Sequence, residues 1–106
     1  MVVKLFESEF DDGIYIFFKN LHKFDRLSDI IKNYGVATLL NHVVGICSII
    51  NIYKINDFEF NLFLHEDLGI CIRLPLERDS KQDEKNYELL RKLGKELILF
   101  LKTRKK

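Results

Sequence analysis

The spacing of hydrophobic positions changes along the chain, and each change marks an expected element. Two apolar runs, residues 5–10 and 14–18, flank Asp11, Asp12 and Gly13. Asp-Gly between apolar runs is a strong signal for a two-residue hairpin turn. The consecutive β-branched and aromatic residues of the second run favour a strand over the alternative, a short helix capped by Asp12. The chain is therefore expected to begin with two paired strands.

Helical spacing follows. Asp25 stands at an N-cap position, and apolar residues recur after it at intervals of three and four, which predicts a helix over residues 26–34. Gly35 is suited to ending this helix. The same spacing continues through residues 36–44 and predicts a second short helix there, although the boundary between the two is left open.

From residue 46 to residue 74 the period falls to two, which predicts a meander of three antiparallel strands. Their expected ranges are 46–55, 58–65 and 70–74. A two-residue turn between the first two strands sets Lys54 opposite Glu59, an ion pair that supports this register. For the next turn, only an odd loop length aligns the apolar residues, so Leu64 is expected opposite Ile70.

The last element is expected to be a long helix. Ser80 and Asp83 resemble a capping box, and leucines at helical spacing predict a helix over residues 81–103. Gly94 inside it should cost about 1 kcal/mol relative to alanine, so close packing is expected there. The expected core between helix and sheet comprises Leu62, Leu64, Ile72, Leu90, Leu93 and Leu97.

Together these elements predict an α+β fold: an N-terminal β-hairpin, helical segments, a three-stranded antiparallel meander and a long C-terminal helix packed on one sheet face. The length of 106 residues is that of a single domain, so residues 1–106 are expected to form one. Cys47 and Cys71 provide no disulfide framework, and the register places them on opposite faces. Both are expected to be free and buried, in a chain without an export signal that resides in the cytoplasm.

Candidate chemistry is sparse. Ser48 and His65 are expected to lie opposite one another with Glu66 alongside, but a nucleophilic serine usually occupies a strained turn with an oxyanion site. A polar sheet face is therefore favoured over catalysis, and no enzyme is expected. The histidines, at positions 22, 42 and 65, and the two cysteines lack the spacing of metal ligands, and the scattered glycines form no phosphate loop. No metal or cofactor is expected.

Charge is distributed unevenly. Residues 1–70 carry 6 Lys/Arg and 10 Asp/Glu, whereas residues 71–106 carry 11 and 6. Acidic turns are often only solvated turns, but gathered together they suit a basic protein partner. The leading hypothesis is a small protein-binding domain that occupies its partner, as inhibitors, immunity proteins and antitoxins do, with a toxin or nuclease as an example of the partner. The predicted partner-binding residues are Glu7, Glu9, Asp11, Asp12, Asp57, Glu59, Glu66 and Asp67, with Ile50, Ile52 and Phe63 as an apolar centre unless the first helix or the hairpin covers it.

The alternative hypothesis is a nucleic-acid-binding accessory protein. Its contacts would come from the basic end of the last helix, Lys102, Arg104, Lys105 and Lys106. Exposed aromatic residues on the sheet would strengthen this hypothesis. Phe63 is the one aromatic residue expected on the outer face of the meander. No apolar run approaches the ~20 residues that a membrane span requires, so no membrane contact is expected.

Overall fold

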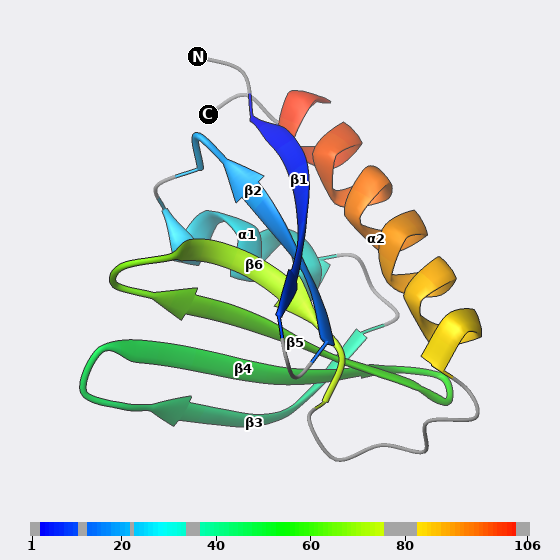
Figure 1. The fold of residues 1–106 in the computed structure, drawn as a ribbon, viewed down its shortest axis with the longest axis horizontal. Coiled ribbons are helices and arrows are strands. Elements are labelled where there is room, and N and C mark those ends of the chain that lie inside the picture. Colours follow the sequence, from blue (N-terminus) through cyan, green and yellow to red (C-terminus); the bar gives the residue numbers. More distant parts are fainter. Residues whose placement is uncertain (1–2, 11–12, 22, 34–36, 76–82, 104–106) are drawn as a thin grey trace.

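A computed structural model describes residues 3–10, 13–21, 23–33, 37–75 and 83–103. Its eight elements form an α+β fold (Figure 1). They are β1 (Lys4–Phe10), β2 (Gly13–Lys19), α1 (Phe24–Asn33), β3 (Ala37–Val44), β4 (Ser48–Ile55), β5 (Phe58–His65), β6 (Gly69–Arg73) and α2 (Asp83–Thr103).

All six strands belong to one antiparallel sheet with the order β1-β2-β6-β5-β4-β3. The N-terminal hairpin therefore does not cover the meander but extends it. Its second strand pairs with β6 over three positions, from Tyr15 opposite Arg73 to Phe17 opposite Cys71. This pairing joins the start of the chain to its last strand.

The predicted registers of the meander are confirmed. Lys54 lies opposite Glu59, and Leu64 lies opposite Ile70. Asn56 begins the two-residue turn between β4 and β5 with a φ of 55°, a left-handed conformation that asparagine tolerates better than most residues. The first of these strands starts at Ser48, two residues later than predicted.

The predicted helix over residues 36–44 is wrong, because Ala37–Val44 forms strand β3 at one edge of the sheet. Its pairing with β4 contains a bulge: Leu39 lies opposite Tyr53 and Asn41 opposite Ile52, which leaves Leu40 without a partner residue. The extra residue shifts the two-residue alternation by one position. The apolar residues on either side then recur at helix-like intervals, which explains the error.

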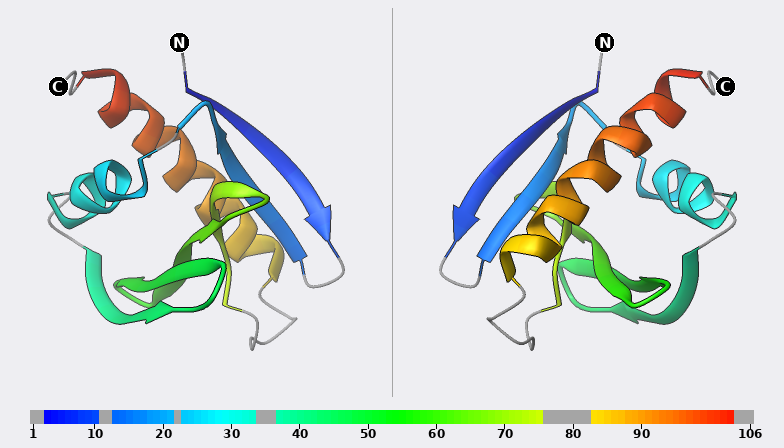
Figure 2. Two further views of the ribbon diagram at one scale, coloured as in Figure 1. Left: turned by 90° about the vertical axis from the view of Figure 1, so that its left-hand side faces the viewer. Right: turned by 90° about the vertical axis from the view of Figure 1, so that its right-hand side faces the viewer.

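Both helices lie on the same, concave face of the sheet (Figure 2). Helix α1 begins at Phe24, so Asp25 lies in its first turn and not before it. Helix α2 crosses the sheet, and its leucine stripe is buried as predicted. The main core comprises residues of both helices and the sheet, including Leu62, Ile72, Leu90, Leu93 and Leu97, with Leu64 packed against it.

Polar contacts fix the helices within this core. Asn51, which is buried, donates from Nδ2 to the Tyr53 hydroxyl at 3.1 Å and to Ser28 Oγ at 3.3 Å, and its Oδ1 contacts His42 Nδ1. These contacts connect α1 to strands β3 and β4. The guanidinium of Arg26 donates to the Leu101 carbonyl at 3.0 Å, which ties α1 to α2.

Gly94 lies where α2 meets the hairpin. A Cβ built at this position would approach the side chains of Leu5 at 3.5 Å and Ile16 at 3.6 Å. These are ordinary van der Waals separations. The predicted neighbour is therefore present, yet it leaves room for a methyl group.

Replacing Gly94 with alanine should raise the free energy of unfolding by roughly 0.5 to 1 kcal/mol, because alanine is the better helix former and its methyl group fits. Urea denaturation followed by circular dichroism measures the change. The adjacent control, Leu93→Ala, should lower the same free energy by about 2 to 5 kcal/mol because it empties a buried site. A Gly94→Ala variant less stable than the parent would show that α2 and the hairpin pack more tightly than described.

Candidate functional site

Five aromatic residues gather on the convex face of the sheet, opposite the helices. This aromatic patch consists of Phe6, Phe10, Tyr15, Phe17 and Phe63, contributed by strands β1, β2 and β5. Successive ring centroids are 4.8 to 6.4 Å apart, with Phe10 and Tyr15 closest and edge to face. Such spacing is typical of favourable aromatic pairs. The patch forms because β2 pairs with β6, which places the hairpin beside Phe63 of the meander.

The outer part of the aromatic patch faces water. Phe6 is 57% exposed and Phe10 is 39% exposed, whereas Tyr15 and Phe63 are buried beneath them. Exposing an aromatic ring forgoes the free energy of its burial, and the loss is recovered when another surface covers it. Clustered exposed aromatic residues on a sheet are therefore a candidate binding surface.

A hollow adjoins the aromatic patch. The pairing of β2 with β6 extends as far as Phe17 and Cys71. The hollow lies beyond this last pair, between the end of β2 and the start of β6. Its volume is about 540 Å³, enough for several side chains. It is lined by Phe6, Ser8, Phe10, Phe17, Phe18, Lys19, Asn20, Leu21, Asp67, Leu68, Gly69 and Ile70.

Arg73 occupies the interior of the patch. Its Nη1 donates to the Tyr15 hydroxyl at 2.8 Å, and its guanidinium carbon lies 4.4 Å from the centre of the Phe63 ring, a cation–π contact. Its Nε and the Oδ1 of Asn61, the residue directly opposite on β5, are buried and have no hydrogen-bond partner among the described residues. Arg73 thus packs between the rings of Tyr15 and Phe63 and holds them in place.

The two cysteines lie in different environments. Cys71 is buried beside Tyr15 and Phe63, and burial raises the pKa of its thiol to about 12 against a smaller lowering by Arg73. Cys47 is exposed, so the prediction that both cysteines are buried is wrong for this residue. Both thiols are free, as predicted. Residues 45–47 project as the turn between β3 and β4, which explains the exposure.

The structure does not gather the described members of the predicted acidic set on one surface. Asp57 lies at one end of β5, while Glu66 and Asp67 follow its other end, about 27 Å away for an eight-residue strand. Glu7 forms an ion pair with Arg91 of α2, in which Arg91 Nε donates a hydrogen bond to Glu7 Oε1 at 2.6 Å. Glu9 and Glu59 are exposed on separate strands. Asp11 and Asp12 lie outside the described residues.

Part of the predicted apolar centre does join the aromatic patch. Phe63 is buried within it, and Ile50 packs against its edge, whereas Ile52 is half-buried on the same strand as Ile50. Asp67 is the acidic residue among those that line the hollow. The sequence indicated Phe63 but not Phe6 and Phe10. The signal for these two was their alternation with Glu7 and Glu9, but its meaning depended on knowing that β2 adjoins β6.

Ser48 and His65 lie opposite one another, as the register predicted. However, His65 Nδ1 accepts a hydrogen bond from the Asp67 backbone amide at 3.1 Å, and its ring lies 5.9 Å from that of Phe63. His65 thus organises the turn between β5 and β6. In the described part of the chain, no group of three or more His, Cys, Asp or Glu residues is arranged to hold a metal ion.

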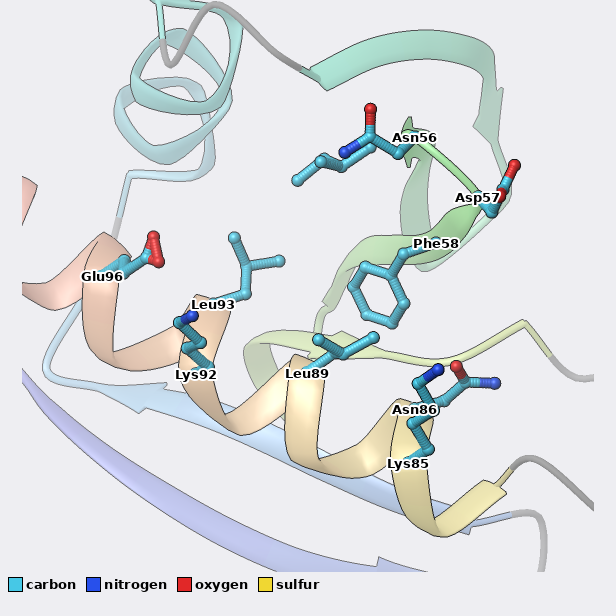
Figure 3. A pocket seen from close by; sticks show the side chains of 10 residues that line it. Asn56, Asp57, Phe58, Lys85, Asn86, Leu89, Lys92, Leu93 and Glu96 are labelled. Atoms are coloured by element: carbon cyan, nitrogen blue, oxygen red, sulfur yellow. The ribbon is translucent and has the colours of Figure 1, made fainter.

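A second hollow of about 380 Å³ lies between α2 and the turn joining β4 to β5 (Figure 3). Phe58 points from the start of β5 toward Leu89 of the helix. Lys85, Lys92, Asp57 and Glu96 also line this hollow. Because charges of both signs surround it, the hollow favours neither an anionic nor a cationic ligand.

Lys102, the described residue of the predicted basic end, does not share a face with the aromatic patch. Lys102 lies in the last turn of α2, on the concave side, where it lines a shallow hollow with Lys4 and Lys95. Arg104, Lys105 and Lys106 lie outside the described residues. None of the described helices has the length and apolarity to cross a membrane.

Comparison of the sequence with protein-family models, with curated proteins and with solved structures found no significant match. The candidate site therefore rests on the aromatic patch and its adjoining hollow.

The different environments of the two thiols predict their reactivity. In the native protein, a thiol reagent such as Ellman's reagent at pH 8 should modify Cys47 rapidly and leave Cys71 unmodified, because only thiolates react and Cys71 is buried and protonated. In denaturant both should react. Two fast-reacting thiols in the native protein would show that the interior of the aromatic patch opens to solvent.

Proposed function

We propose that the chain is a protein-binding domain that acts by occupying its partner, and that the aromatic patch with its hollow is the contact surface. One observation carries this proposal: Phe6 and Phe10 remain 57% and 39% exposed on a regular strand, beside a hollow of about 540 Å³. Aromatic side chains with adjacent pockets are the features that dominate binding energy in protein interfaces. An inhibitor or immunity-type protein would work in this way.

The hollow suits an apolar side chain of the partner. The charged residues around the hollow select which charges the partner can carry next to that side chain. Asp67 lies at the wall formed by the turn between β5 and β6, directly after Glu66, and Lys19 lies on the opposite wall. A basic group of the partner next to its apolar anchor would therefore be attracted to the β5–β6 turn. We therefore still propose a basic partner, but one whose basic group contacts only the acidic turn between β5 and β6.

Affinity capture from the native host, with and without nuclease, tests the proposal. The matched variants are Phe6→Ser with Phe10→Ser on the patch, and Leu99→Ser on α2, where the leucine is 61% exposed. The partner should resist nuclease, be lost with the patch variant and be retained with the control. Retention by all three proteins would remove the patch from the interface.

A second candidate is binding of single-stranded nucleic acid, and the structure offers one observation for it. Exposed Phe6 and Phe10 could stack on bases, while Lys19, which lines the adjoining hollow, could contact phosphates. Lys102, Arg104, Lys105 and Lys106 belong to this hypothesis as further cations. Capture abolished by nuclease, with an affinity that falls steeply with salt, would favour it over the protein-binding function.

Charge reversal at the β5–β6 turn should slow association with the captured protein. Glu66→Lys with Asp67→Lys is expected to reduce the association rate at least about tenfold at low salt and less at high salt, because steering acts on the encounter. Surface plasmon resonance at two ionic strengths measures it. The control, Asp57→Lys with Glu59→Lys near the other end of β5, makes the same change in net charge and should associate at the parental rate. Equal slowing by both variants would mean that net charge, not the site, governs binding.

A further inference from the structure

Strand β3 is the edge of the sheet farthest from the aromatic patch, and it is unusually apolar for an edge. It pairs only with β4, so its other side presents backbone groups that no described strand satisfies. Its four large hydrophobic side chains are between 43% and 66% exposed. Edge strands of this kind are sites of pairing with another chain. They are Leu39, Leu40, Val43 and Val44.

The opposite edge of the sheet shows the difference. Strand β1 carries Lys4, Glu7 and Glu9, and charged side chains are a common protection of an edge against pairing. In contrast, the chain has no Asp, Glu, Lys or Arg from residue 33 to residue 53, a range that contains all of β3 and its neighbour β4 as far as Tyr53. Within the described residues, five of the ten exposed large hydrophobic side chains fall between Leu39 and Ile46.

We propose that β3 pairs antiparallel with β3 of a second copy of this chain, so that two sheets join across a two-fold axis. A two-fold interface requires a surface that complements itself. A strand without Asp, Glu, Lys or Arg meets this requirement, because pairing with its own copy brings no such like charges together and gathers the exposed apolar side chains of both copies at one junction.

The side chains of β3 would bury on both faces of the joined sheet. Val44 lies opposite Ile49 and Leu39 opposite Tyr53, on the face that the helices cover, whereas Val43 lies opposite Ile50 on the convex face. The bulge at Leu40 limits the straight part of the edge to Asn41–Val44. The backbone pairing is therefore short, and the exposed side chains around it supply most of the buried area.

The dimer is independent of the proposed partner contact. The aromatic patch belongs to β1, β2 and β5, and the hollow opens beside β1 and β2, at the other end of the strand order. Two patches would remain accessible in one dimer, so the particle would bind its partner through two equivalent sites. Loss of dimerisation would leave the single-site contact intact, and loss of the patch would leave the dimer.

Sedimentation equilibrium of the full chain over a range of concentrations tests the proposal. The fitted mass should rise to twice the 12.6 kDa of the chain. Val44→Lys and Val43→Lys should each weaken dimerisation by at least about tenfold, because each variant replaces one apolar side chain per copy at the junction with a charge that the dimer would have to desolvate. Leu99→Lys, which alters a side chain as exposed as Val44, should leave the dissociation constant unchanged.

A spin label on the exposed Cys47 gives a second measurement that needs no change to β3. Cys47 lies three residues after the strand, and Cys71 is buried, so each chain carries a single label. The dimer should show a dipolar coupling between labels that disappears on dilution with unlabelled chain. A chain that stays at 12.6 kDa and shows no coupling at its highest soluble concentration overturns the proposal, and so does a monomer that binds a foreign strand peptide at β3.

Discussion

The packing of the α2 leucine stripe into the concave face of the sheet is the constraint on which the other features depend. Leu90, Leu93, Leu97 and Leu101 are all buried there, and α1 fills the remaining part of the same face through Leu27 and Ile31. Because both described helices cover one face, no helix in the described part of the chain covers the convex face or the two edges of the sheet. The aromatic patch and the apolar β3 edge are both consequences of this arrangement.

On the convex face, which no described helix covers, Arg73 is buried among aromatic side chains. It fills space between Tyr15 and Phe63 through a hydrogen bond and cation–π contacts instead of an ion pair with any described carboxylate. A buried cation costs desolvation energy that aromatic faces offset only in part. The convex face therefore carries a cost in folding stability at Arg73, which agrees with the proposed role in binding.

Local patterns in the sequence were sufficient for the meander and the long helix. Strict alternation set the register of β4, β5 and β6, and the leucine stripe located α2, because both patterns arise from one buried face. The segment that forms β3 was predicted to be a helix because one bulged residue, Leu40, breaks the alternation of the strand. The aromatic patch was missed for a different reason: it depends on β2 meeting β6, and Tyr15 and Arg73 are 58 residues apart in the chain.

The same β2–β6 junction has a consequence for how the chain folds. Four of the five strand pairs join consecutive strands through turns of two or three residues, so they can close early, whereas pairing of β2 with β6 must close a far longer loop that contains the whole meander. Until then β6 is itself an unprotected edge, with Ile72 and Cys71 open to water. We therefore expect the rate of folding to be set by the docking of the hairpin. The time that β6 spends uncovered would then govern how readily newly made chains aggregate.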